Sequence, residues 1–289
     1  MMLRGAVSPF RRLSAVSLYF GCHLAAAVLL ALPVVALVAG TGIGRFPEGD
    51  RLLFEPGGLL FAEVGRELLP TLPSQVASGI GTGAMLGLAL LLPHAALLVS
   101  FSNQERKGLA STWGRAFGHL PALLSLGGLA LLAQVIVLAG ALAVGQMLRG
   151  AFSASARSAD LAFVAALALG VLFSALLGIT RDLGRAAAVR GSLAGKEALL
   201  EGLRAFARAP GRAFIAWAMP AAAAVAFVAL GAVLTAALDV SRPSTWRVWS
   251  VALLHQAIAF ALCFCRAFWL SASFGIVGAP SPNVRADQP

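Results

Sequence analysis

Charge is what this chain lacks most. Charged residues make up 12% of its 289 positions, whereas soluble domains carry about 25%. Hydrophobic residues make up 59%, and the mean hydropathy is +0.87. The composition therefore argues against an ordinary soluble protein and predicts a chain whose solvent is lipid.

Cysteine and membrane-buried acids are also scarce. The three cysteines, Cys22, Cys263 and Cys265, lie in apolar runs and form no disulfide or zinc pattern. No Asp or Glu lies in the centre of an expected span, which weighs against a proton-coupled carrier. Phosphate-binding loops, nucleophile motifs and paired acids are missing as well. We therefore expect a non-enzymatic protein without cofactor or metal.

Long runs free of charge are what the chain has instead. A spanning helix needs about 20 apolar residues, and six segments meet this requirement. The sequence predicts an all-α, polytopic membrane protein with one six-span domain over 1–289. The expected spans lie near 14–40, 76–101, 119–147, 160–181, 212–238 and 247–274. A cleaved signal peptide is the alternative for the first span, but its apolar run exceeds the usual 7–15 or so residues.

The basic residues predict the orientation of these spans. With the N-terminus inside, 15 of the 22 Lys and Arg residues fall on the inner side and 7 on the outer side. Five of the twelve acidic residues lie in the outer loop 41–75. The positive-inside rule then makes three outward hairpins with both termini cytoplasmic. The net charge of +10 follows from this topology and needs no nucleic acid partner.

The basic residues also hint at the source. Twenty of the 22 are Arg, and Ala, Leu and Gly are used heavily. This bias is typical of a GC-rich bacterial genome, so we expect a bacterial cytoplasmic (inner) membrane.

A short phrase occurs twice, as RAFGHLP at 115–121 and RAFARAP at 204–210, each time before an apolar run. On a helix, the segment 187–210 gathers leucines on one side and most of its charges on the other. Such a segment suits the inner membrane surface, and the closing Pro permits a turn into the bilayer. The predicted contacts with the lipid bilayer and its anionic inner-leaflet headgroups are Arg115, Phe117, Arg204, Phe206, Arg208 and Arg212.

The first copy of the phrase predicts the same arrangement on a smaller scale. Asn103 would cap a short surface helix, and Pro121 would open the third span. Chance repetition in a chain rich in Ala and Arg is the alternative.

Two further sets of residues stand out inside the expected spans. Gly79, Gly83 and Gly87 share one helix face, which predicts close packing within the monomer or, alternatively, dimerisation. Arg266 is the only charge away from the ends of an expected span and, with His255 and Gln256, marks a possible intramembrane polar site. Snorkelling of Arg266 and plain interhelical hydrogen bonds from the histidines are the simpler interpretations.

In its layout and its repeated elbows, the whole chain resembles the six-helix membrane domain of bacterial membrane-anchored glycerophosphodiester phosphodiesterases and their stand-alone uncharacterised relatives. The catalytic domain of that family is absent here, so the resemblance implies a scaffold or transport-associated part without catalytic residues. We expect a scaffold that binds lipid or a membrane protein partner. The alternative is a carrier or permease subunit for a small apolar or anionic solute.

Overall fold

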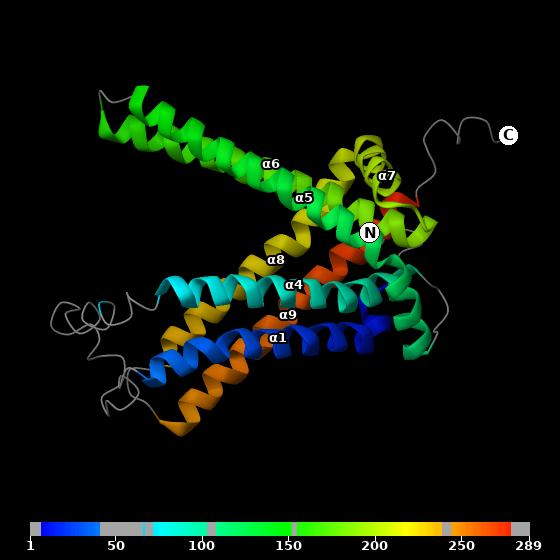
Figure 1. Cartoon of the computed structure of the whole chain (residues 1–289), viewed down its shortest axis with the longest axis horizontal. Coiled ribbons are helices and arrows are strands. Elements are labelled where there is room, and N and C mark those ends of the chain that lie inside the picture. The colour runs from blue at the N-terminus through cyan, green and yellow to red at the C-terminus, as the bar shows by residue number, and fades with distance from the viewer. Residues whose placement is uncertain are drawn as a thin grey trace. The chain divides into compact units, whose positions relative to one another are not determined.

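The computed structural model describes residues 7–40, 66, 72–102, 108–151, 155–238 and 244–278, and every element in them is a helix (Figure 1). The helices are η1 (Pro9–Arg12), α1 (Leu13–Gly40), α4 (Leu72–Ser102), α5 (Leu109–Ala151), α6 (Ala156–Gly191), α7 (Gly195–Arg208), α8 (Pro210–Ala237) and α9 (Thr245–Val277). Most of the expected outer loop 41–75 lies outside the described residues.

Six segments of the described chain are long and apolar enough to cross a membrane. They are Pro9–Leu32, Gly79–Ser102, Ala110–Ala151, Arg157–Gly191, Pro210–Ala237 and Thr245–Val277. Each overlaps one predicted span, which confirms the all-α class and a multi-pass integral membrane protein. The arrangement of the spans as three outward hairpins stays a prediction.

Two of these helices are much longer than a bilayer requires. At about 1.5 Å per residue, the 43 residues of α5 and the 36 of α6 exceed the roughly 30 Å of a hydrocarbon core. Each of the two helices is therefore long enough to extend beyond the apolar layer and make contacts there.

The chain divides into two compact units. Unit 1 comprises 1–12, 95–220 and 267–289, and unit 2 comprises 13–94 and 221–266. Helices α4, α8 and α9 contribute to both units.

Apolar side chains of neighbouring helices meet at two points in unit 2. The ring of Phe20 in α1 meets that of Phe260 in α9 edge to face, at 5.4 Å between centroids. Gly231 in α8 makes room for the side chain of Ile258 in α9. A Cβ at position 231 would collide with the end of that side chain, so the side chain of Ile258 occupies the space that the glycine leaves.

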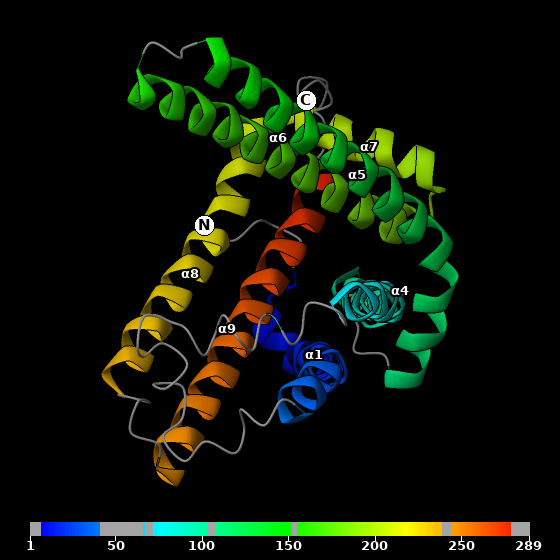
Figure 2. The same cartoon turned by 60° about the vertical axis from the view of Figure 1, so that its left-hand side comes forward.

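In unit 1, α5 and α6 run side by side in opposite directions (Figures 1 and 2). Gln134 Nε2 donates to the carbonyl of Ser174 at 3.0 Å, and farther along α5 Ala141 packs against Gly170. Residue numbers thus rise on α5 as they fall on α6. Gln134 satisfies its amide across the pair, as expected of a polar group within a span.

The first copy of the repeated phrase does not form the expected elbow. Helix α5 begins at Leu109 and runs through Pro121 to Ala151 without a break, so the prediction that a separate short helix ends before Pro121 is wrong. The predicted cap, Asn103, lies outside the described residues. A proline removes one backbone hydrogen bond and kinks a helix without having to end it. Figure 2 shows α5 changing direction in its first part, where its colour passes from teal to green.

The second copy of the phrase does lie at a break. Helix α7 ends at Arg208, and α8 begins at Pro210, where proline is well suited to the first helical position. Residues 187–191, which the sequence placed in the surface segment, belong instead to α6.

The turn from α6 into α7 is fixed by a helix cap. Ser192 adopts the left-handed conformation, with φ 51°, and the amide of Leu193 donates to the carbonyl of Ala188 at 3.2 Å. This pattern satisfies the last carbonyls of α6 and reverses the chain. Leu193 then packs on a small core of Leu126, Ala188 and Ala198.

Candidate functional site

Helix α7 packs closely on α6 through residues without bulk. Ala198, Gly202 and Ala205 form its buried face. A Cβ at Gly202 would lie 2.5 Å from the backbone nitrogen of Gly184 and 2.8 Å from the carbonyl oxygen of Thr180. Two backbones approach this closely only where both helices carry small residues, so α7 is held firmly against α6.

The side of α7 turned away from α6 carries leucines. Leu200 is 44% exposed and Leu203 is 45% exposed, while Phe206 is half-buried beside the packed face. These neighbouring leucines form an apolar strip on a helix that is not a span, and such a strip suits contact with lipid or a partner.

Most charged residues of α7 form a third side, whereas Lys196 falls on the leucine side. Glu201 Oε2 lies 3.7 Å from Arg204 Nη1, and Glu201 Oε1 pairs with Arg208 Nη2. Arg208 Nε also donates to the carbonyl of Arg204 at 3.2 Å. One carboxylate therefore bridges two guanidinium groups. The sequence placed these residues on one side but did not predict the pairing.

The remaining predicted surface residues lie apart from α7. Arg212 is exposed in the first turn of α8. In α5, Phe117 is 56% exposed and Arg115 is half-buried. Their contact with headgroups stays a prediction.

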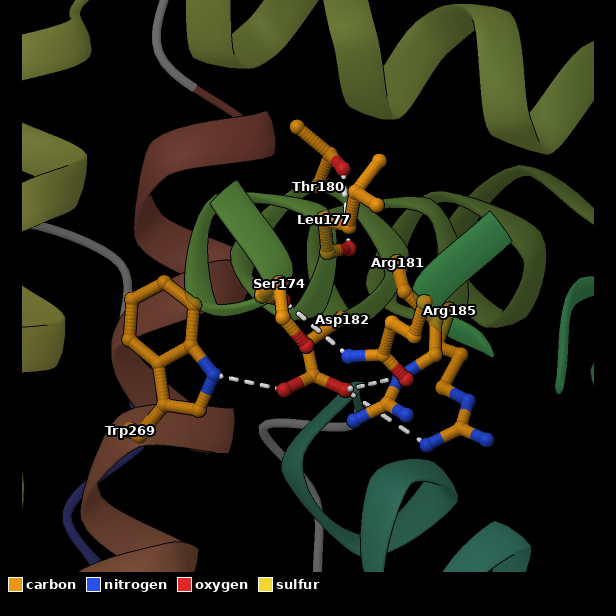
Figure 3. Close-up of polar contacts among 8 residues, drawn as sticks. Ser174, Leu177, Thr180, Arg181, Asp182, Arg185 and Trp269 are labelled. Atoms are coloured by element: carbon orange, nitrogen blue, oxygen red, sulfur yellow. Dashed lines mark hydrogen bonds and ion pairs between the residues drawn. The ribbon is translucent and has the colours of Figure 1, made fainter. Parts of the chain in front are cut away.

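A buried polar cluster links α6 to α9 within unit 1 (Figure 3). Asp182 is 1% exposed, and its Oδ2 accepts a hydrogen bond from Trp269 Nε1 at 2.9 Å. Its Oδ1 accepts from Arg181 Nε at 3.3 Å and from Arg185 Nη1 at 3.4 Å. Two guanidinium groups and an indole N–H therefore provide the hydrogen-bond partners that a buried carboxyl group requires.

Our sequence analysis missed Asp182, although a signal was present. The residues RDLGR at 181–185 directly follow an apolar run and place Asp182 and Arg185 one helical turn apart. Helix α5 leaves room for this pair, since a Cβ at Gly127 would lie 3.3 Å from Arg185 Nη2.

Other polar contacts join the end of α9 to its neighbours in unit 1. Arg190 Nη1 in α6 donates to the carbonyl of Phe274 at 3.1 Å, which satisfies a carbonyl in the last turn of α9. Ser271 Oγ donates to the carbonyl of Val7 at 2.5 Å. The segment before α1 is thus tied to α9.

The predicted intramembrane polar site does not form one cluster. His255 and Gln256 are exposed on α9, and His255 Nε2 hydrogen-bonds with Thr235 Oγ1 of α8 at 3.4 Å. Arg266 is half-buried eleven residues farther along the same helix, which is about 16 Å of helical rise. The histidine therefore serves a helix–helix contact.

Among the residues that the structure describes, the glycine stripe of α4 meets no neighbour. A Cβ at Gly79, Gly83 or Gly87 would have no other atom within 4 Å, so the structure shows no close helix contact there. Packing through this stripe stays a prediction.

Within the described residues, no group of three or more His, Cys, Asp and Glu side chains is placed to hold a metal ion. The three cysteines are free thiols. No family model, curated protein or solved structure matches the chain.

Proposed function

We propose that the chain is a non-enzymatic scaffold of the bacterial cytoplasmic membrane that binds anionic lipid through α7. One observation carries this proposal: α7 is fixed to α6 by backbone-close packing and yet leaves Leu200 and Leu203 exposed. An amphipathic helix with basic residues beside its leucines suits the membrane surface.

Each part of α7 then has a physical role. The leucines enter the boundary of the acyl chains, while Arg204 and Arg208, together with Arg212 of the next helix α8, face phosphates. Each basic residue near an anionic surface contributes about 1 kcal/mol, and salt weakens this attraction. Because α6 already holds α7 in place, little conformational entropy is lost on binding.

The distribution of basic residues indicates on which side of the membrane α7 lies. The 15 to 7 ratio favours cytoplasmic termini and therefore a position at the inner surface for α7, which lies between the fourth and fifth spans. A second membrane protein seated on the scaffold fits the same arrangement. The resemblance to the six-helix domain of the phosphodiesterase family agrees with a scaffold and transfers no catalytic residue.

The alternative, a carrier for a small anionic solute, has one observation in its favour. Asp182, Arg181 and Arg185 are charges within an apolar helix, and such charges often mark transport pathways. Their mutual pairing and the hydrogen bond from Trp269 support a structural role more directly.

Lipid retention tests the proposal. The purified protein should carry anionic lipids that native mass spectrometry detects, and the double variant Leu200→Ala/Leu203→Ala should lose most of them. Its matched control is Leu131→Ala/Leu132→Ala, which removes the same groups from an exposed face of α5 and should retain them. Equal retention in both variants would contradict lipid binding through α7, and uptake of an anionic solute into vesicles by the wild-type protein would favour the carrier.

A further inference from the structure

The bridge at Glu201 has the geometry of an anion held by a fork. Its two carboxylate oxygens each meet a different guanidinium, one from Arg204 and one from Arg208. The two arginines lie four residues apart, so their side chains stand over one another on the helix surface. The carboxylate thus occupies the position that a phosphate with the same two partners would take.

We infer that Arg204 and Arg208 form a seat for a lipid phosphomonoester, and that Glu201 is the seat's internal competitor. This inference rests on the proposed function of α7. A phosphomonoester carries about −1.5 to −2 charges at pH 7 and three strong acceptor oxygens, against one charge on the carboxylate. It can therefore displace Glu201, whereas a singly charged phosphodiester has much less advantage.

Solvent exposure makes this displacement feasible. The side chain of Arg204 is 71% exposed, that of Arg208 31% and that of Glu201 28%. Ion pairs this accessible are weak, so exchange of one anion for another costs little. The ion pairs with Glu201 therefore lower the affinity of the two arginines for phosphate but do not prevent phosphate from binding.

The neighbouring residues favour a lipid over free phosphate. Leu200 and Leu203 lie exposed on the same helix, where they can meet the acyl chains of a lipid whose headgroup is held by the arginines. Inorganic phosphate would gain nothing from these leucines, so it should bind at least about tenfold more weakly, by the loss of apolar burial alone.

The test titrates the full-length protein in detergent with short-chain phosphatidic acid, short-chain phosphatidylglycerol and inorganic phosphate. Binding is measured by isothermal titration calorimetry. Wild type should prefer phosphatidic acid to phosphatidylglycerol by about tenfold because of its extra charge. Glu201→Gln should raise the affinity for phosphatidic acid about three- to tenfold, since it removes the competing pairs.

Glu197→Gln is the matched control. It removes the same charge from the same helix, but within the described residues Glu197 pairs with neither arginine. The affinity of this variant for phosphatidic acid should therefore differ from that of wild type by less than about twofold. Arg204→Gln/Arg208→Gln should weaken binding at least about tenfold.

Equal gains in affinity for phosphatidic acid in Glu201→Gln and Glu197→Gln would contradict the proposed seat, because the change in net charge alone would then explain both gains. Equal affinities for inorganic phosphate and phosphatidic acid would overturn its assignment to a lipid. Either result can occur while the Leu200→Ala/Leu203→Ala variant still loses its retained lipid. In that case the proposed role of α7 at the membrane surface stands. If that variant also retains its lipid, the proposed function fails as well.

Discussion

Gly202→Ala is expected to lower the melting temperature of the purified protein, although alanine is the better helix former. The new Cβ would lie 2.5 Å from the backbone nitrogen of Gly184 and 2.8 Å from the carbonyl oxygen of Thr180. Backbone atoms cannot move aside as a flexible side chain can. Forcing extra carbon into such a contact costs about 1–3 kcal/mol, and Gly202→Leu should cost more.

Gly118→Ala is the control for this prediction. Gly118 lies exposed in α5, and a Cβ there would meet no atom within 4 Å. Removal of a glycine from a helix interior then stabilises by up to about 1 kcal/mol. The two variants should shift the thermal unfolding transition in opposite directions. Stabilisation by both would mean that α7 does not pack on α6 at this point.

Asp182→Asn is expected to lower the free energy of unfolding more than Gly202→Ala does. It removes the charge that two buried or half-buried arginines share, with Arg185 only 9% exposed at its side chain. Breaking a buried ion pair by removing one partner costs about 3–5 kcal/mol. Trp269→Phe removes the donor to Oδ2, which should cost about 1–3 kcal/mol, and part of a buried ring, whose cavity adds to that cost.

A surface pair provides the control for Asp182. Asp160 Oδ1 lies 3.0 Å from Arg149 Nη2, but both side chains are more than half exposed. Asp160→Asn should therefore change the free energy of unfolding by less than about 1 kcal/mol. The double variant of Asp182 and Trp269 should lose less than the sum of the two single losses, because both act on one carboxylate. Equal effects of the Asp182 and Asp160 changes would show that Asp182 is not buried in an ion pair.

The spans could be predicted because lipid imposes a simple requirement on the sequence. About 20 apolar residues must follow one another, and the run of α8 or α9 shows this directly. The end of α7 at Arg208 was also foreseeable, since Pro210 opens the next helix. Pro121 misled the same reasoning, because a membrane helix tolerates an internal proline where neighbouring groups satisfy its freed carbonyl.

The contacts between helices were harder to predict from the sequence than the spans. Glycine allows a close approach but does not identify its partner, so Gly202 and Gly184 were overlooked while the stripe through Gly83 was singled out. Asp182 was missed because it lies just beyond an expected span end. The bridge at Glu201 depends on which rotamers the two arginines adopt, and helical spacing alone does not determine these.

The depth of α7 in the bilayer tests the central claim most directly. In a variant without the three native cysteines, Leu203→Cys and Glu197→Cys would each carry an environment-sensitive dye in lipid vesicles. The two positions are about 120° apart around the helix, with Leu203 on the leucine side. We predict strong quenching of the dye at 203 by lipids brominated near the headgroup, and strong quenching of the dye at 197 by aqueous iodide. If iodide quenches both dyes equally and brominated lipid quenches neither, α7 does not lie on the membrane and the proposed lipid scaffold is wrong.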